Sequence, residues 1–454
     1  ENALLSYSMA QKSIVLLQNK QDVLPLKKNT EKIAVIGPNA HNAPMMWGNY
    51  NGMPNHTVTI LDGIKKKQKK IAYFPGCDLT CDKTMYCLMG TQCSIEGKKG
   101  LKGTVGNVMS FGIAYRTAPA ITVSDSRDVA LHNVSLYHAG GMGVVAQRTR
   151  NILIDSLFVV PAPGKGRINS VAADATHFVN CSGYLNIYNS RLVNQTDDAS
   201  NIHGVYYRIA DILPDRQLCV ELANDAQYGF DCFCPGLPIE FTSPQSLVTY
   251  AHAKVKSYYR INDHKYMLTL AGAIPDSVKK GDVIAAEGDY PEVHIKGCYF
   301  GGNRARGLLL GSRARMLIED NEFRTPGTAL LLEGDGRYWF EQAGVRNVIV
   351  RRNTFNNCNF GIWNRGTIGT GSGIERQYYS QSFYNRNLLI EDNTFLIHRS
   401  PILYLYSVDG ITFRNNRIVR SDKLYPCSVR PDETEDLFQL IDCKNAHIDK
   451  GRVE

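Results

Sequence analysis

The chain has 454 residues, of which 43% are hydrophobic and 21% charged, so it is too long for one ordinary domain and has the composition of a globular protein. Its net charge of +8 is modest and spread out, which argues against a nucleic-acid partner. No window approaches the roughly 18 consecutive apolar residues of a membrane span. The chain starts at Glu1 without an apolar leader, so we expect a mature form or a fragment, whose compartment is unknown from these residues.

The first 82 residues predict a short α/β fragment. The stretch SMAQKSIVLLQNK (8–20) has helical spacing of its apolar residues, and IAVIGPN (33–39) is a continuous apolar strand that ends in a turn. A second helix, ILDGIKKK (60–67), and a second strand, IAYFPGC (71–77), follow. This order predicts two parallel strands joined by a helical crossover.

These stretches closely resemble the opening of the C-terminal α/β domain of glycoside hydrolase family 3. The matching residues are KSIVLLQNKQDVLPLKK (12–28), KIAVIGPNA (32–40), GNYNG (48–52), ILDGIK (60–65) and FPGCDLT (74–80). The resemblance ends near Cys81, and the barrel on which that family carries its nucleophile is absent. No catalytic residue is therefore transferred from this fragment, and residues 83–104 are interpreted as a junction.

Cysteine spacing does not indicate a metal site. Three, five and five residues separate the successive cysteines Cys77, Cys81, Cys87 and Cys93, whereas structural zinc sites use CxxC pairs with two residues between them. We therefore expect no metal and no cofactor, and interpret the thiols as buried.

From about residue 105 a β-rich repeat appears. Each copy is six residues long: the first and last are apolar, the fourth is Asn or a small residue, and the other three vary. The first residues of successive copies are 23, 33, 108, 23, 32, 40 and 23 residues apart. The copies are LHNVSL (131–136), IDSLFV (154–159), IYNSRL (187–192), IKGCYF (295–300), IEDNEF (318–323), VRRNTF (350–355), IEDNTF (390–395) and FRNNRI (413–418).

A recurring minimum of 23 residues predicts a right-handed parallel β-helix, in which each coil adds short strands at the strand spacing of about 4.8 Å. The Asn of each copy is expected at a bend in the left-handed conformation, or in a ladder of stacked side chains inside the coil. The 108-residue interval contains alternating strands and turns, and predicts an inserted antiparallel, barrel-like domain at 210–290. The β-helix then occupies 105–209 and 291–454, and the fold class is mainly β.

The same period brings acids together. Asp174 precedes Asp197 by 23 residues and Asp198 by 24, so these three residues occupy equivalent positions on consecutive coils. Their carboxyl groups are expected about 5 to 9 Å apart, the range found in glycosidases. Consecutive residues of a regular strand face opposite sides, so Asp197 and Asp198 share a cleft only if the chain bends there. The alternative is a solvated polar turn.

Over about residues 105–454 the chain resembles glycoside hydrolase family 110, the bacterial α-1,3-galactosidases. The matching stretches are ITVSDSRDVALHNVSLYHAGGMGVVAQRTRNILID (121–155), INSVAADATHFVNCSGYLNIYNSRLVNQTDDASNIHG (168–204), GNRARGLLLGSRA (302–314) and YWFEQAGVRNVIVRRNTFNNC (338–358). The resemblance implies a β-helix with inserted barrels, an inverting hydrolysis without metal, and a secreted or periplasmic protein. It also implies that Asp174, Asp197 and Asp198 are the catalytic acids.

The predicted activity is exo-acting release of terminal α-1,3-linked galactose from blood group B-type or linear glycans. We assign Asp197 as general acid, and Asp174 and Asp198 as the residues that hold and deprotonate water, and the sequence leaves the reverse assignment open. A galactose site also needs polar side chains for the hydroxyl groups and an aromatic ring for the apolar face of the sugar. The alternative interpretation of such residues is that they form surface ion pairs and packed aromatic side chains. The substrate-binding candidates are His138, His203, Arg304, Arg306, Glu333, Trp339, Glu341 and Trp363.

Two other functions compete with this prediction. A polysaccharide lyase on the same scaffold would need Ca²⁺-binding acids and a basic residue, and only Arg191 lies near the acids in sequence. A catalytically impaired or glycan-binding β-helix is the second alternative, because an unrelated fragment replaces the first coils that the family has, and repeat arrays need capping. The oligomeric state is unknown from the sequence.

Overall fold

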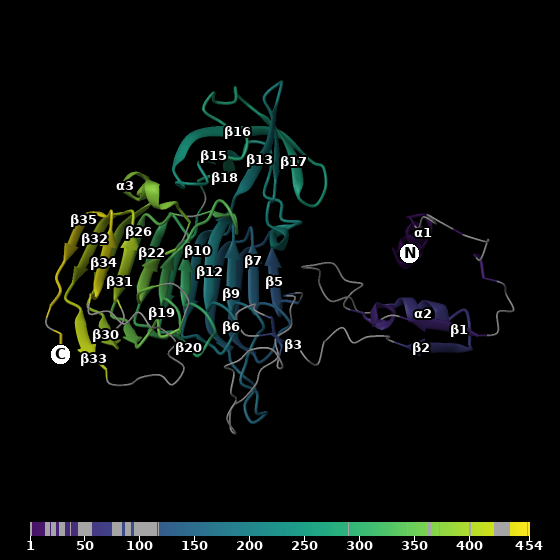
Figure 1. Cartoon of the computed structure of the whole chain (residues 1–454), viewed down its shortest axis with the longest axis horizontal. Helices are drawn as coiled ribbons and strands as arrows, with labels where there is room; N and C mark the ends of the chain where they lie inside the picture. Colours follow the sequence, from purple (N-terminus) through teal and green to yellow (C-terminus); the bar gives the residue numbers. More distant parts are fainter. Residues whose placement is uncertain are drawn as a thin grey trace. The chain divides into compact units, whose positions relative to one another are not determined.

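The computed structural model confirms the predicted fold class, a parallel β-helix with an inserted antiparallel barrel and a small α/β part (Figure 1). The described residues are 2–13, 19, 24–26, 32–36, 38–43, 57–74, 84–86, 92–94, 116 and 118–454, except 289, 343, 362–364, 372, 399–400, 422–435 and 452. The chain divides into two compact units, the first formed by residues 1–85 and 94–98 and the second by 86–93 and 99–454. Helices α1 (Asn2–Ser13) and α2 (Ile60–Lys65) belong to the first unit.

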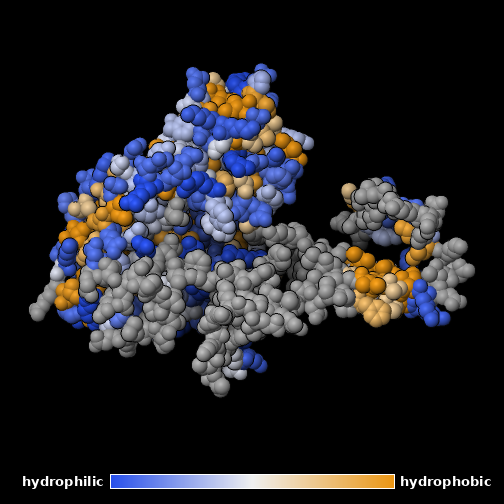
Figure 2. Space-filling view, in the orientation of Figure 1, coloured by the Kyte–Doolittle hydropathy of each residue, from blue (hydrophilic) through white to orange (hydrophobic). Residues whose placement is uncertain are grey.

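The α/β part contains the predicted parallel strand pair. Strands β1 (Ile33–Ile36) and β2 (Ile71–Phe74) pair in parallel, with Ile33 opposite Ile71. Helix α2 starts with a capping box in which Thr59 and Asp62 bond each other's backbone N–H groups. Ile36, Ile60 and Phe74 are exposed here, in the part that shows much apolar surface in Figure 2. Two more short strands, β3 (Thr84–Tyr86) and β4 (Gln92–Ser94), pair with each other.

The β-helix has three parallel ladders of strands, here called faces A, B and C. Long strands β6 (Arg127–Leu136) and β8 (Arg150–Val159) contribute to both A and B. Face A continues through β10 (Ser182–Tyr188), β19 (Glu292–Lys296), β22 (Arg315–Glu319), β26 (Asn347–Arg351), β29 (Asn385–Glu391), β32 (Val408–Arg414) and β35 (Lys444–Ile448).

Face B continues through β11 (Arg191–Val193), β20 (Tyr299–Gly301), β23 (Glu322–Arg324), β27 (Thr354–Asn356), β30 (Thr394–Ile397) and β33 (Arg417–Arg420). Face C consists of β5 (Ile121–Ser124), β7 (Val144–Gln147), β9 (Thr176–Val179), β12 (Ser200–Val205), β21 (Leu308–Leu310), β24 (Leu330–Leu332), β28 (Ile368–Thr370), β31 (Leu403–Tyr406) and β34 (Phe438–Ile441).

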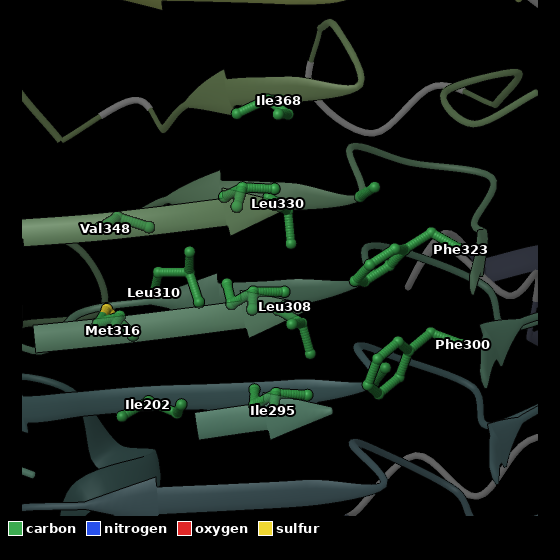
Figure 3. Close-up of a cluster of buried hydrophobic side chains, with 14 of the residues drawn as sticks. Ile202, Ile295, Phe300, Leu308, Leu310, Met316, Phe323, Leu330, Val348 and Ile368 are labelled. Carbon is green, nitrogen blue, oxygen red and sulfur yellow. The ribbon is translucent and has the colours of Figure 1, made fainter. Parts of the chain in front are cut away.

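The core of the β-helix is a column of stacked apolar side chains. On face C, Ile202, Leu310 and Leu332 are buried one above another, and Figure 3 shows such residues facing Ile295, Met316 and Val348 of face A. Phe300 and Phe323 stack with ring centroids 4.9 Å apart, close to the strand spacing. One coil therefore repeats the packing of the previous one, which fixes the register of every coil.

The inserted barrel interrupts the β-helix after β12. It is closed by β13 (Tyr207–Leu213), β14 (Gln217–Glu221), β15 (Pro238–Thr242), β16 (Thr249–Arg260), β17 (Lys265–Leu270) and β18 (Val283–Ala286). Its own core includes Tyr207, Phe241 and Tyr266. Beside its base, β25 (Glu341–Gln342) pairs antiparallel with β12, and a short helix, α3 (Tyr379–Ser382), lies on a later coil (Figure 1).

Candidate active site

Asp174, Asp197 and Asp198 meet on consecutive coils. Strand pairing places Ser200 of β12 opposite Thr176 of β9, so Asp198 stacks over Asp174, and the Asp198 N–H donates to the Asp174 carboxylate at 3.3 Å. Asp197 lies in the predicted bend, between β11 and β12. One carboxylate oxygen of each residue lies within 4.8 Å of the others, and all three residues are buried. This is the short end of the predicted range.

Asp197 has two arginine partners and a raised pKa. Arg304 contacts one carboxylate oxygen at 2.9 Å and Arg116 contacts the other. Burial, followed by the charges of Asp198 and Asp174, raises the pKa of Asp197 to about 6 despite these arginines. A carboxyl group that keeps its proton up to about pH 6 has the property that a general acid needs in weakly acidic solution.

Asp198 is held by Arg306, which lies one coil further along. The Arg306 guanidinium donates to both carboxylate oxygens at 2.9 and 2.7 Å, and the Arg306 backbone N–H adds a third bond at 2.9 Å. Such bidentate pairs fix orientation as well as charge. Asp198 is therefore rigidly placed beside the other two acids.

Asp174 is paired with a histidine that the prediction missed. His177 Nδ1 lies 2.7 Å from Asp174 Oδ2, and His177 Nε2 lies 2.9 Å from His203 Nε2. Burial alone would raise the pKa of Asp174, but the bond from His177 and its charge lower it. Asp174 and Asp197 thus differ in the direction of their pKa shifts, although they are neighbours.

Two predicted glutamates also lie at this site. The Glu333 carboxylate is 3.9 Å from Arg306, and burial raises its pKa to about 7. Glu341 of β25 accepts bonds from Asn201 at 3.2 and 3.4 Å and lies 3.6 Å from His203 Nε2. Through these contacts the structure joins His203, Arg306, Glu333 and Glu341 to the acids.

The remaining predicted residues are less closely connected. Trp339 lies on the loop before β25, where its side chain is 47% exposed and its backbone C=O accepts a bond from Gln227 of the barrel. His138 is exposed, with Arg167 2.8 Å from its ring, and no recorded contact among the described residues links it to the three acids. Trp363 lies outside the described residues.

The spacing of the three carboxylates is also compatible with binding a cation. Arg116, Arg304, Arg306 and His177 already contact these carboxylates and supply positive charge in the place of a metal. The absence of a metal requirement stays a prediction.

A cavity of about 250 Å³ lies between the barrel and the β-helix, but none of the three acids lines it. His203 does, together with Arg148, Glu287 and Gln342. His203 therefore lines this cavity and also contacts His177 and Glu341 beside the acids.

Sequence reasoning missed Arg116 and His177. His177 follows Asp174 by three residues in the stretch DATH, and this short separation is the signal that could have indicated their contact. Arg116 is 81 residues from Asp197 and no periodicity connects the two, so only the folded chain shows their contact.

Family models match three parts of the chain. Residues 14–201 match the glycosyl hydrolase family 3 C-terminal domain, residues 217–284 match GLAA-B beta-barrel domain II, and residues 282–423 match a right handed beta helix region. The first range extends well beyond the described α/β part into strands of the β-helix. The handedness that was predicted from the repeat agrees with the third match.

Curated relatives confirm both resemblances. The chain is 31% identical to alpha-1,3-galactosidase B of Bacteroides thetaiotaomicron over 351 residues, which are 77% of this chain and 56% of that protein. It is 33% identical to alpha-1,3-galactosidase A of Shewanella woodyi over 334 residues, 73% of this chain and 54% of the relative. A xylan 1,4-beta-xylosidase of Xylanibacter ruminicola is 68% identical over 141 residues, 30% of this chain and 16% of the xylosidase. The chain spans about half the length of the galactosidases that it matches.

Proposed function

We propose that the chain is an exo-acting glycoside hydrolase that releases terminal α-1,3-linked galactose with inversion at the anomeric carbon. The observation that carries the proposal is the cluster of three buried carboxylates, in which the pKa of Asp197 is raised and that of Asp174 is lowered. Hydrolysis of a glycosidic bond needs one protonated and one ionised carboxyl group within reach of a single sugar. The homology to α-1,3-galactosidases supports galactose as that sugar.

In this mechanism Asp197 protonates the departing glycosidic oxygen, because its raised pKa keeps a proton available. Asp174 and Asp198 orient a water molecule on the opposite face, and Asp174 takes its proton. Arg306 occupies both oxygens of Asp198, which disfavours Asp198 as a nucleophile and supports water attack. The short oxygen separations alone are closer to those of retaining enzymes, so the product anomer is the deciding measurement.

Galactose recognition is assigned to the polar residues around the acids. Arg304, Glu333 and Glu341 would bind hydroxyl groups, and the exposed Trp339 ring would cover the apolar face of the sugar. The substrates are galactose-terminated glycans, of the linear or the blood group B type.

The test is to incubate the purified chain with p-nitrophenyl α-galactoside and α-1,3-galactobiose and to identify the first-formed galactose by proton NMR. We expect the β-anomer, and turnover that EDTA does not change. The α-anomer would contradict inversion. An unsaturated product absorbing in the ultraviolet would indicate a lyase, and galactose binding without turnover would indicate a glycan-binding protein.

Substitution assigns the acids. Asp174→Asn, Asp197→Asn and Asp198→Asn are each expected to lower kcat by at least about 100-fold, the usual contribution of a general acid or base. Asp215→Asn is the matched control, because Asp215 lies at the exposed β13–β14 turn with φ of 59°, which Asn tolerates. Near-normal turnover in one of the three variants would remove that residue from the mechanism.

A further inference from the structure

Two imidazole rings connect Asp174 to the barrel side of the β-helix. His177 of β9 and His203 of β12 lie edge to face, with ring centroids 4.9 Å apart and an interplanar angle of 85°. The hydrogen bonds run from Asp174 through His177 to His203, and from His203 Nδ1 to the backbone carbonyl of Gly204 at 2.7 Å. Both rings are buried or nearly so.

The partners of these four nitrogens determine where the protons are. A carbonyl oxygen only accepts, so His203 Nδ1 carries a hydrogen. If His203 is neutral, its Nε2 accepts, and His177 Nε2 must donate. His177 Nδ1 faces a carboxylate oxygen at 2.7 Å, which also accepts. With Asp174 ionised, each of these bonds has one donor only if one of the two rings is an imidazolium, and when that ring is His177, His203 is the neutral Nδ1–H tautomer.

The surrounding charges favour the cation on His177 over His203. His177 is 2.7 Å from Asp174, whereas the carboxylate nearest to His203 is Glu341 at 3.6 Å. Arg116 is the positive group that opposes the cation, and the strand neighbours of His177 are the uncharged Val145 and Asn201. Burial lowers the pKa of both rings, but the bond to Asp174 gives His177 a net raised pKa while that of His203 stays lowered.

We infer that His177 is a positioning residue that holds Asp174 ionised and fixed in orientation, and that His203 keeps His177 in this state by accepting its second N–H. The inference rests on the proposed function, since it assigns Asp174 to water activation. Without a cation at this place, Asp174 would lie buried beside two other acids and would already carry a proton, so that it could not accept the proton that the water gives up.

The charge state is tested first, without reference to activity. In protein labelled with ¹⁵N-histidine, a long-range ¹⁵N–¹H spectrum at pH 7 should show one imidazolium that is absent from a His177→Gln variant. It should also show one Nδ1–H tautomer absent from His203→Gln. A neutral His177 at pH 7 would overturn the inference, whether or not the protein is a galactosidase.

The second test is the pH dependence of kcat in His177→Gln, which keeps a donor for Asp174 but removes the charge. We expect at least a tenfold lower maximum, and an acidic limb shifted upward by about one to three pH units, the effect of one nearby charge. His294→Gln is the matched control, because His294 also bonds a carboxylate, Glu319 at 3.1 Å, on face A. A loss confined to KM, or an unmoved acidic limb, would overturn the inference. Inactivity of the wild-type chain would instead refute the proposed function.

Discussion

At the scale of single residues, the three acids of the site occupy similar positions on the coils but are contacted by different side chains. Asp197 has arginines on both oxygens but two carboxylates beside it, Asp198 has a guanidinium on both oxygens, and Asp174 has a histidine. The period of the chain makes these positions alike, and residues from other coils make them different. General acid–base chemistry uses this difference, because it assigns the shared proton to one particular carboxyl group of the cluster.

The pKa of Asp197 predicts how kcat/KM changes on the basic side of the pH profile. In the proposed mechanism the Asp197 proton is needed for catalysis, and the pKa of Asp197 is about 6, so kcat/KM should fall about tenfold per pH unit above about pH 6. The measurement is the initial rate of galactose release at low substrate concentration between pH 4 and 9. A rate that stays constant up to pH 8 would exclude Asp197 as the general acid.

Glu333 predicts a pH-dependent stability. Burial raises the pKa of Glu333 in the folded chain from an ordinary 4.5 to about 7. Between pH 4.5 and 7, Glu333 therefore loses its proton in the unfolded chain but keeps it in the folded chain. Its contribution to stability is thus lost as pH rises from 4.5 to 7. The Glu333→Gln variant should be more stable than wild type at pH 8, by on the order of 2 to 3 kcal/mol, and equal to it at pH 4.5. Thermal unfolding at both pH values checks this, and an equal gain at both would contradict it.

At the scale of elements, a ladder of hydrogen-bonded asparagine side chains connects consecutive coils of the β-helix. Asn321, Asn353, Asn393 and Asn416 are buried one above another, and each side-chain oxygen of the last three accepts from the backbone and side chain of the one before. The ladder was predicted as one of two possibilities. In these four coils the left-handed conformation belongs instead to the preceding residue, such as Asp320 with φ of 56°, because the ladder Asn must point inward.

Asn353→Ala tests the ladder. The change leaves the buried Asn321 N–H without its acceptor and removes one of the two donors to the Asn393 side-chain oxygen, and each lost bond of this kind costs about 1 to 3 kcal/mol. We expect a loss of about 2 to 5 kcal/mol in urea unfolding. The exposed Asn347→Ala, at the start of β26, is the control and should change stability by less than about 1 kcal/mol. Equal effects of the two changes would argue against the ladder.

At the scale of the whole molecule, a buried ion pair connects the inserted barrel with the β-helix. Glu240 of β15 is bonded by Arg313, from the loop between β21 and β22, at 2.6 and 2.8 Å, and by Gln342 of β25 at 2.8 Å. Burial would raise the pKa of Glu240, but the Arg313 charge and these bonds lower it. The barrel base is thereby fixed beside Glu341, the neighbour of Gln342 and a residue of the candidate site.

Arg313→Met is expected to destabilise the chain by about 3 to 5 kcal/mol, because it leaves the Glu240 charge buried without its cation. The double variant Glu240→Gln, Arg313→Met should recover at least half of the loss. Unfolding free energies of the four proteins form a double-mutant cycle. Additive effects would show that the two side chains do not act as a pair.

No helix in the part of the chain that the structure describes is long and apolar enough to cross a membrane. The domain boundaries predicted from the sequence stay predictions, and so do the roles of the site residues.

The sequence by itself determined the coil, the barrel and the alignment of the acids, because a parallel β-helix converts a spacing of about 23 residues directly into one strand spacing. It thus placed the Asp197–Asp198 pair beside Asp174, with a bend as the condition for a shared cleft, and the structure then put Asp198 directly over Asp174. Only the tertiary structure decided the directions in which the pKa values of Asp174 and Asp197 shift, since Arg116 and His177 reach the acids from positions that the period does not connect. Periodicity fixes backbones, whereas pKa values depend on every charge and every solvent-excluding group that the fold brings within a few ångströms.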